Sequence, residues 1–294
     1  MVSVTNKQKA INLLRKVSTN KTQNGSCPNQ IESVGTIRNY RDCIKMYLDW
    51  CAINLVPNNL LGGKLSLIHY LEEKSEIYQQ KTLDQHRMAL NLSYHKKLPF
   101  VKSLLDTVLS ARDYRFSEVM LLIKNLNSRN AVAILICFFS GLRAHELATI
   151  ERLDEGSLST ARLWSNQLFS FEENFIIYLV TGKGGLCRQV AIPINLAIII
   201  ESRRLIRPIR VRDREIYYLM NYDLGYGKAL SQCFSRASLK YLSWSTGLHG
   251  LRHSYAKNRI KKILVNGFNL ENAKLVVSQE LGHFRPEIVN CYLR

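Results

Sequence analysis

One segment in the middle of the chain has a clear β pattern, and helical patterns lie on both sides of it. Two apolar runs, residues 175–180 and 188–194, flank the Gly-rich segment 181–185. In the second run apolar residues alternate from Val190 onward, and two such runs around a Gly-rich turn are typical of a β-hairpin. We therefore expect a mainly α-helical protein with a small antiparallel sheet.

The first third of the chain has the residue spacing of helices. Apolar residues recur every three or four positions from Ile37 to Cys51, and basic residues lie off that stripe. We predict a helix that begins with Thr36 as its N-cap, followed by further helices over residues 65–78, 83–95 and 101–111. Residues 20–29, rich in Asn, Thr, Gln, Gly, Ser and Pro, are typical of a loop.

A domain boundary is expected near residues 111–116, where charged residues interrupt the apolar pattern. We predict a helical domain over residues 1–112 and a mixed α/β domain over residues 113–294. In the second domain Ser117 is predicted to cap a helix, and a strongly apolar helix over residues 131–139 ends at Gly141. From Asn195 onward the pattern indicates helices again.

The charge of the chain indicates a polyanionic partner. Lys and Arg total 41 against 23 acidic residues, a formal net charge of +18. No run approaches the roughly 20 apolar residues of a membrane span, so nucleic acid is favoured over a membrane surface. The seven cysteines follow no zinc or disulfide spacing and the N-terminus lacks a signal-peptide core, so we expect a cytoplasmic protein with free thiols.

Five short segments contain residue types that carry chemistry. They are Gly141-Leu142-Arg143-Ala144-His145-Glu146-Leu147, Lys183 in the Gly-rich turn, His249-Gly250-Leu251-Arg252-His253, Leu281-Gly282-His283, and Tyr292, nine residues after His283. Each alone has an ordinary structural explanation, such as a surface arginine or a packed tyrosine. The turn lacks the P-loop pattern, and glycine follows His249 where a zinc-protease motif has glutamate.

Taken together, these segments resemble the tyrosine recombinase, or phage integrase, family. That family has, in this order, an arginine, a hairpin lysine, His-x-x-Arg, Gly-His and a tyrosine. The resemblance covers the chain from about Arg115 to its end, and the helical first part resembles more weakly the family's core-binding domain. It implies a DNA-binding domain over residues 1–112 and a catalytic domain over residues 113–294.

The implied function is site-specific recombination, in which DNA is cleaved and rejoined through a 3′-phosphotyrosyl intermediate. By resemblance, Arg143 and Arg252 hold the non-bridging phosphate oxygens, which two guanidiniums can do without losing their charge. His283 adds a hydrogen bond to the same oxygens. Glu146 fits the acidic position that orients an arginine of this clamp.

The remaining roles also follow from the resemblance. Tyr292 is the nucleophile, and Lys183 protonates the departing 5′-oxygen as a general acid. His249 handles the tyrosine proton or positions the phosphate. We expect His145 and His253, which lie in the same motifs, to be structural.

The resemblance implies double-stranded DNA as the partner, a homotetramer on the DNA, and accessory DNA-bending proteins. It implies that no cofactor and no metal take part. The implied setting is the integration or excision of a mobile element. Many members carry a segment after the tyrosine that docks on a neighbouring subunit. Here Arg294 follows Tyr292 by two residues, so we expect an altered subunit exchange and a simple two-domain form without an arm-site domain.

Three other functions stay open at this point. A type IB topoisomerase uses similar Arg, Lys, His and Tyr chemistry but relaxes DNA without pairing two sites. A DNA-binding regulator descended from recombinases needs no catalysis, although the complete residue set argues against it. A metal-dependent nuclease is the weakest alternative, because no compact carboxylate cluster is visible.

Overall fold

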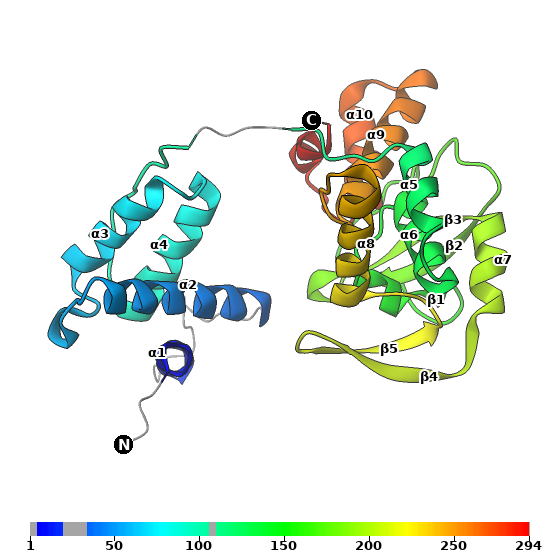
Figure 1. Ribbon diagram of the computed structural model, residues 1–294. Helices are drawn as coiled ribbons and strands as arrows, with labels where there is room; N and C mark the ends of the chain where they lie inside the picture. The colour runs from blue at the N-terminus through cyan, green and yellow to red at the C-terminus, as the bar shows by residue number, and fades with distance from the viewer. Residues whose placement is uncertain (1–4, 20–33, 106–109, 294) are drawn as a thin grey trace. The chain divides into compact units, whose positions relative to one another are not determined.

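The structure, a computed structural model, describes residues 5–19, 34–105 and 110–293 (Figure 1). It divides into two compact units, Met1–Val108 and Leu109–Arg294, which we call unit 1 and unit 2. Each unit has a hydrophobic core of its own. No helix in the described ranges is long and apolar enough to cross a membrane.

Unit 1 is a helical bundle around an aromatic core. Its helices are α1 (Asn6–Thr19), α2 (Val34–Ile53), α3 (Lys64–Ser75) and α4 (Gln80–Tyr94), with a short 3-10 turn η1 (Asn58–Leu60). The rings of Tyr47, Trp50 and Tyr70 pack against one another at centroid distances of 5.3–6.2 Å. Such edge and offset contacts add to the apolar area that the rings bury.

The helices predicted over residues 65–78 and 83–95 are confirmed as α3 and α4. The prediction of Thr36 as an N-cap is wrong, because Thr36 lies inside α2. Helix α1 was not expected, and the loop expected over residues 20–29 lies outside the described residues.

The helix predicted over residues 101–111 is also wrong for the residues that the structure describes there. The backbone of this segment is bound to other parts of unit 1 instead. The Ser103 amide donates to the Gln80 side chain, the Ser103 hydroxyl donates to the Tyr78 carbonyl, and the Leu104 amide donates to the Ser75 carbonyl. These tertiary hydrogen bonds outweigh the helical spacing of the apolar residues.

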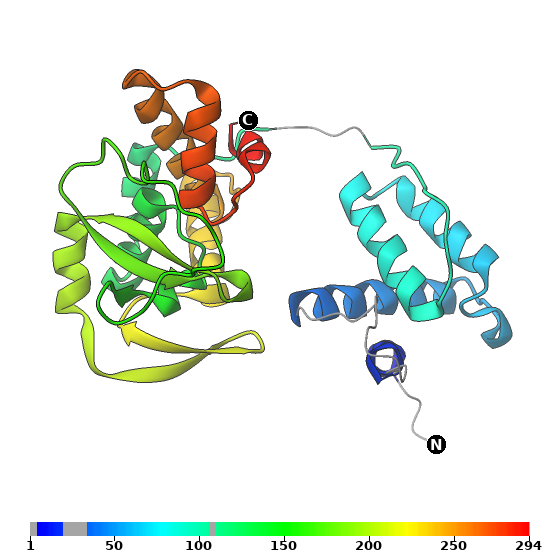
Figure 2. The same cartoon turned by 180° about the vertical axis from the view of Figure 1, so that it is seen from behind.

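Unit 2 combines helices with a small antiparallel sheet. Its helices are α5 (Phe116–Ile123), α6 (Ser128–Ser140), α7 (Ile194–Ser202), α8 (Gly227–Leu242), α9 (Gly250–Val265) and α10 (Leu270–Glu280), with 3-10 turns η2 (Glu146–Thr149), η3 (Lys183–Gly185) and η4 (Pro286–Tyr292). The sheet has the order β1-β2-β3, from β1 (Glu151–Arg152), β2 (Phe175–Thr181) and β3 (Cys187–Pro193). Figure 2 shows this sheet in front of α6 and α8, with α9 and α10 above it.

The predicted hairpin is confirmed as β2 and β3, which pair in register from Phe175 opposite Pro193 to Thr181 opposite Cys187. The apolar helix that was expected to end at Gly141 is α6, whose C-cap is Gly141 in the left-handed conformation. Ser117 was wrongly predicted as a cap. Arg115 holds that position in α5, and its amide donates to the Glu118 carboxylate at 2.7 Å.

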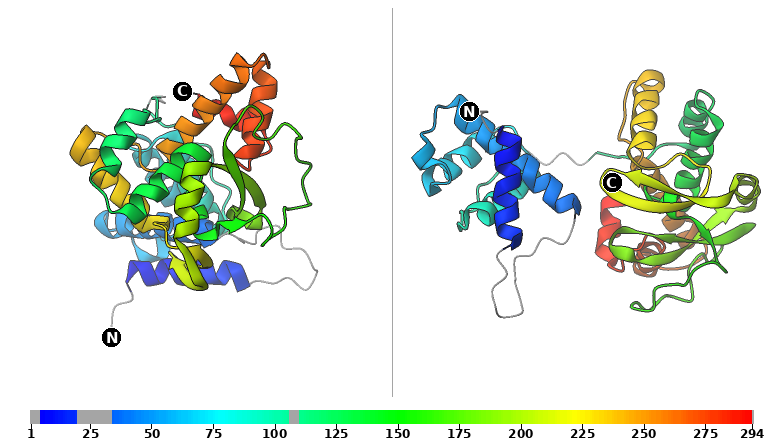
Figure 3. Two further views of the ribbon diagram at one scale, coloured as in Figure 1. Left: turned by 90° about the vertical axis from the view of Figure 1, so that its right-hand side faces the viewer. Right: turned by 90° about the horizontal axis from the view of Figure 1, so that it is seen from below.

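A second hairpin interrupts the helices predicted after Asn195. Strands β4 (Arg204–Asp213) and β5 (Ile216–Tyr222) form a separate two-stranded sheet. In the right-hand view of Figure 3 this sheet faces the viewer and crosses unit 2. The prediction of continuous helices was therefore wrong over residues 204–222. In β4 arginines alternate with apolar residues near the tip, a period of two that favours a strand, and Pro208 is tolerated at an irregularity in the pairing.

Candidate active site

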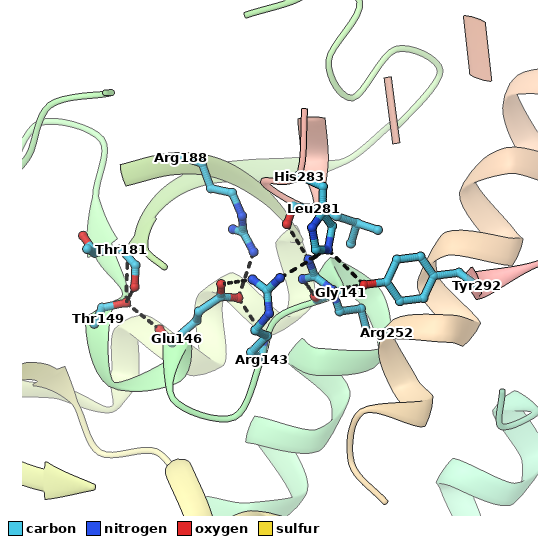
Figure 4. A network of polar contacts seen from close by, with 10 residues as sticks. All are labelled: Gly141, Arg143, Glu146, Thr149, Thr181, Arg188, Arg252, Leu281, His283 and Tyr292. Carbon is cyan, nitrogen blue, oxygen red and sulfur yellow. Dashed lines mark hydrogen bonds and ion pairs between the residues drawn. The ribbon is translucent and has the colours of Figure 1, made fainter. Parts of the chain in front are cut away.

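Four of the six predicted catalytic residues meet in unit 2, although up to 149 positions separate them in the sequence. His283 Nε2 lies 3.0 Å from the Tyr292 hydroxyl oxygen (Figure 4). The same nitrogen lies 3.2 Å from Nη2 of Arg143 and 3.2 Å from Nη2 of Arg252. The four side chains come from the loop after α6, from α9, from the turn after α10 and from the end of η4. They form a single hydrogen-bonded group.

Two glycines turn the chain so that these side chains can meet. Gly141 has a φ of +63° and ends α6, and a β-carbon there would lie 2.6 Å from the Tyr255 ring. Gly282 has a φ of +72° and turns the chain between α10 and His283. Both positions need the left-handed conformation that glycine adopts without steric cost. The Gly-Leu-Arg and Gly-His motifs therefore have a structural basis.

Arg252 is the buried centre of the site. Its side chain is fully buried, and it donates to the carbonyl oxygens of Gly141 and Leu281 and, at 3.3 Å, to the Tyr292 hydroxyl. Burial, together with the charge of Arg143, lowers the pKa of Arg252 to about 10, so it stays protonated at neutral pH. Backbone carbonyls thus hold one fixed positive charge against the tyrosine.

Glu146 holds the second guanidinium of the predicted clamp. Its carboxylate accepts hydrogen bonds at 2.8 Å from the Arg143 amide and the Arg143 guanidinium. Burial alone would raise the pKa of Glu146, but the charges of Arg188, Arg252 and Arg143 outweigh it and hold the pKa at about 2. The carboxylate is therefore ionised and orients Arg143, as the resemblance implied.

Arg188 is a member of this cluster that the sequence analysis missed. It lies on β3, is 1% exposed, and donates to Glu146 at 2.8 Å. Within the described ranges its Nη1 atom has no hydrogen-bond partner. Three guanidiniums thus surround one carboxylate, and the cluster has a surplus of positive charge. An arginine within an apolar strand run was the only sequence signal for it.

His283 is neutral in this arrangement. Burial and the charges of Arg252 and Arg143 lower its pKa to about 3. Guanidinium N–H groups only donate, so the His283 Nε2 atom that faces them is an acceptor here. A phosphate oxygen held by the two arginines would itself accept, and Nε2 could then carry the proton and donate to it.

His249 lies beside the group of four, next to the tyrosine. Its ring centroid is 6.1 Å from that of Tyr292 and 5.6 Å from that of His253. Burial and the charge of Arg252 lower the pKa of His249 to about 4. His253, which was expected to be structural, is buried and packs edge-on against the Tyr292 ring at 4.8 Å.

Lys183 lies in η3, at the tip of the β2–β3 hairpin, and its side chain is outside the described part of the structure. The backbone of the hairpin is nevertheless tied to the site. The Thr181 amide donates to the Thr149 hydroxyl at 3.0 Å, and that hydroxyl donates to the Glu146 carbonyl at 2.8 Å. The loop that carries Lys183 therefore starts beside the segment that orients Arg143.

Neither a protein-family model nor a curated protein matches this sequence. Solved structures match its fold. The XerH site-specific recombinase bound to its difH substrate matches with a TM-score of 0.57 at 16% identity, over 99% of this chain and 94% of that one. A lambda integrase dimer bound to a COC′ core site matches with a TM-score of 0.56 at 13% identity, over 97% and 77%.

The integrase of the transposon Tn1549, in complex with transposon right-end DNA, matches with a TM-score of 0.52 at 15% identity, over 98% and 94%. The chain has the tyrosine recombinase fold. The expected architecture, helical with small antiparallel sheets, is confirmed by these tyrosine recombinases. Identities of this size show the fold alone, so the roles of the six residues stay predictions.

None of the described residues form a group of three or more His, Cys, Asp or Glu side chains that could hold a metal ion. The site has a tyrosine hydroxyl in contact with the Arg252 guanidinium and the neutral His283, with the Arg143 guanidinium on His283 and the neutral His249 beside the tyrosine ring. Such a group can bind a phosphodiester and place a nucleophile on it.

Proposed function

We propose that this protein is a tyrosine site-specific recombinase that cleaves and rejoins duplex DNA through a covalent bond to Tyr292. The observation that carries the proposal is the convergence of the Tyr292 hydroxyl with His283 and the two guanidiniums of Arg143 and Arg252. A buried tyrosine needs one hydrogen-bond partner for its hydroxyl. The hydroxyl of Tyr292 contacts the Arg252 guanidinium and His283, and Arg143 lies on the other side of His283, so that two cations favour a bound anion next to the tyrosine.

In the cleavage step the Tyr292 oxygen bonds to the phosphorus and the bond from phosphorus to the 5′-oxygen breaks. The products are a 3′-phosphotyrosine and a free 5′-hydroxyl. The reverse attack, by a 5′-hydroxyl of the partner strand, restores the phosphodiester and the tyrosine. Because the covalent step conserves the bond, rejoining needs no ATP.

The guanidiniums of Arg143 and Arg252 stabilise the negative charge that builds on the non-bridging oxygens. Each preorganised donor of this kind contributes about a hundred- to a thousandfold in rate. The orientation is set in advance, because Glu146 holds Arg143 and the carbonyls of Gly141 and Leu281 hold Arg252. His283 completes the clamp as a neutral donor.

Two proton transfers accompany the reaction. The tyrosine proton leaves as the oxygen attacks, and we assign its transfer to His249, whose ring lies 6.1 Å from that of Tyr292 and is unprotonated at neutral pH. The departing 5′-oxygen gains a proton from Lys183 on the hairpin tip. Both assignments follow the family pattern of the sequence.

The substrate in this proposal is two short duplex sites, joined by a homotetramer with accessory DNA-bending proteins, in the integration or excision of a mobile element. The net charge of +18 supports DNA as the partner. Two of the similar structures are a recombinase on its difH substrate and a transposon integrase on transposon end DNA. Basic residues of both units would contact phosphates and set the register.

A nicked suicide substrate tests the nucleophile. Wild-type protein should form a covalent protein–DNA band on denaturing electrophoresis, and Tyr292→Phe should bind the same DNA without forming it. Tyr241→Phe, which removes a hydroxyl from α8, is the matched control and should form the band. A covalent band from the Tyr292→Phe variant would rule Tyr292 out.

A sulfur substitution at the bridging 5′-oxygen tests Lys183. A thiolate leaves without protonation, since an ordinary thiol has a pKa of about 8.5. Lys183→Ala should be slow on normal DNA and near wild type on the sulfur substrate, whereas Arg143→Ala should be slow on both. Equal defects of Lys183→Ala on both substrates would make Lys183 a phosphate contact.

Recombination between paired sites separates this proposal from a type IB topoisomerase. The recombinase should exchange strands between two copies of its site. A protein that relaxes supercoiled plasmid but never joins two sites would favour the topoisomerase.

A further inference from the structure

The tip of the β4–β5 hairpin has two different faces. Val211 lies opposite Tyr218, and both pack against the hydrophobic core of unit 2. On the other face Arg210 lies opposite Leu219 and Arg212 lies opposite Tyr217. Because side chains alternate along a strand, the second face points away from the core. We call Arg210, Arg212 and Tyr217 the hairpin arginine face.

The hairpin is firmly attached to the rest of unit 2. Met220 and Tyr222 of β5 are buried, and the Tyr222 hydroxyl donates to Glu201 at 3.0 Å. Near the tip, the carboxylate of Asp213 accepts from the Lys228 amide at the start of α8 at 2.8 Å. The hairpin arginine face is therefore presented from a fixed support.

The arginines at the base and at the tip of the hairpin differ in their partners. At the base, Arg203 pairs with Asp223 and Arg204 pairs with Glu155. At the tip, the guanidiniums of Arg210 and Arg212 lie 4.0 and 5.6 Å from the centroid of the same ring, that of Tyr217.

Both tip arginines are exposed, and neither forms an ion pair with any acidic residue in the described ranges. The ring restrains the guanidiniums and leaves N–H groups free to donate. Two restrained, unneutralised guanidiniums on one exposed ring are a surface suited to an external anion.

The hairpin is joined to the segment that carries Arg143. Strand β5 packs against η2, the Gly227 amide donates to the Ala144 carbonyl at 2.8 Å, and the rings of His145 and Tyr218 lie 6.3 Å apart. Within unit 2, the tip and η4, which carries Tyr292, lie toward the same side in Figure 1 and in the right-hand view of Figure 3. A duplex that reaches the site can therefore also pass the hairpin.

We propose that the hairpin arginine face binds the phosphate backbone of the duplex that enters the site. This inference rests on the proposed function, because it takes DNA as the partner. A guanidinium matches a phosphate in planar, bidentate geometry, and a flexible lysine would not need an aromatic support. A protein partner with acidic residues is the alternative that the experiment must exclude.

The salt dependence of binding measures these contacts directly. Full-length protein with Tyr292→Phe, which should bind without cleaving, is titrated with duplex DNA over a range of salt concentrations. Each phosphate neutralised contributes about −0.9 to the slope of log K against log salt. Replacing both tip arginines by glutamine should therefore make the slope shallower by about 1.8.

Two matched variants isolate the cause. Arg210→Lys with Arg212→Lys keeps the charge and should keep most of the slope. Lys240→Gln with Lys261→Gln removes the same charge from exposed positions on α8 and α9 and should change the slope by less than half as much. Thermal unfolding should be unchanged in all of them, because the substituted side chains are exposed.

An unchanged slope in the double glutamine variant, or an equal change in the Lys240/Lys261 variant, would overturn the inference. If the slope were unchanged and cooperative binding were lost as well, the hairpin would be a contact for a second protein rather than for DNA. If the parent protein itself bound duplex DNA without salt dependence, the proposed function would fail first. The two failures are therefore distinguishable.

Discussion

Two clusters of arginine and glutamate in the described part of unit 2, each with a buried carboxylate at its centre, differ in their charge balance. In the first, Arg143 and Arg188 bind Glu146, with Arg252 close enough to lower the pKa of that carboxyl. Three guanidiniums face one carboxylate. Burial and the neighbouring cation lower the pKa of Arg252 to about 10.

The second cluster joins α9 to α10. Arg259 donates to both oxygens of Glu280 and to Glu172, and Lys262 also donates to Glu172. Two cations face two carboxylates. Burial opposes the charge of Arg259, but its bonds to Glu280 outweigh burial and raise its pKa above the usual value.

The two buried arginines thus differ: the pKa of Arg252 is lowered, whereas that of Arg259 is raised. In the second cluster, which we call the balanced cluster, each charge has an opposite charge as its partner. This pairing offsets the free-energy cost of burying the charges. The cluster at the candidate site has three guanidiniums for one carboxylate, and under the proposed function a phosphate supplies the missing negative charge. In our proposal the first cluster is a binding site and the second a structural support, and this division can be tested.

The largest expected effect is a loss of unfolding free energy when the balanced cluster is broken. Arg259→Met leaves the buried Glu280 carboxylate without its bidentate partner and should cost about 3–5 kcal/mol of unfolding free energy. Arg188→Met should cost less than half of that, because Arg143 still binds Glu146. Denaturant titration of both variants measures this, and equal losses would break the comparison.

The next effect is on chemistry. Arg143→Ala should lower the rate of covalent capture about a hundred- to a thousandfold. Its stability should change by less than about 1 kcal/mol, because the side chain is partly exposed and Arg188 keeps Glu146 paired. Arg259→Met should capture DNA at the wild-type rate per folded molecule. A capture defect in Arg259→Met that exceeds its unfolded fraction would contradict the division of roles.

The two histidines beside the cluster around Glu146 should also make the free energy of unfolding sensitive to acid. The pKa values of His249 and His283 are lowered, to about 4 and about 3, chiefly by burial. Below pH ~6.5 the unfolded chain binds protons that the folded one does not, so stability falls as the pH drops from ~6.5 toward the folded pKa values.

Each histidine should account for about 2 kcal/mol between pH 6.5 and 4.5. His283→Asn should therefore flatten the fall by about that amount, as measured by chemical denaturation at several pH values. His95→Asn, at an exposed histidine of unit 1, is the control and should follow the wild type. An identical pH profile for His283→Asn would show that His283 is protonated equally in both states.

The smallest effect is stabilisation by a small oxyanion. Sulfate at five times its Kd should raise the free energy of unfolding by about 1 kcal/mol. That corresponds to a rise in Tm of about 2–4 °C for a unit of this size. At matched ionic strength the gain over chloride should vanish in Arg143→Ala and persist in Lys261→Ala. The same gain in Arg143→Ala would mean that sulfate acts elsewhere.

The sequence predicted the fold class and the residues of a candidate site, but it missed particular elements of the fold. Arg143, Arg252 and His283 stand in short motifs with glycines that turn the chain, so their order and spacing are visible without a structure. Arg188 was missed because an arginine in an apolar strand run has the pattern of a solvent-facing residue. Its partner, Glu146, lies 42 positions away, and no local pattern connects them.

The missed elements depend on tertiary contacts. Helix α1 is polar in composition and buries only a few residues, Ala10 and Leu14 among them, against α2 and α4. Strands β4 and β5 contain Pro208 and many arginines, which obscure their period of two, and the core contacts of Val211 and Tyr218 select the strand. Local propensity did not contain this information.

The central claim is that Tyr292 becomes covalently bound to DNA, and mass spectrometry of the captured complex tests it most directly. Wild-type protein is trapped on a nicked suicide substrate, the DNA is trimmed with nuclease, the protein is digested, and the nucleotide-bearing peptide is sequenced by fragmentation. The account predicts a nucleotide on Tyr292 and on no other residue. A nucleotide on any other side chain, or no covalent adduct on a substrate that the protein cleaves, would contradict it.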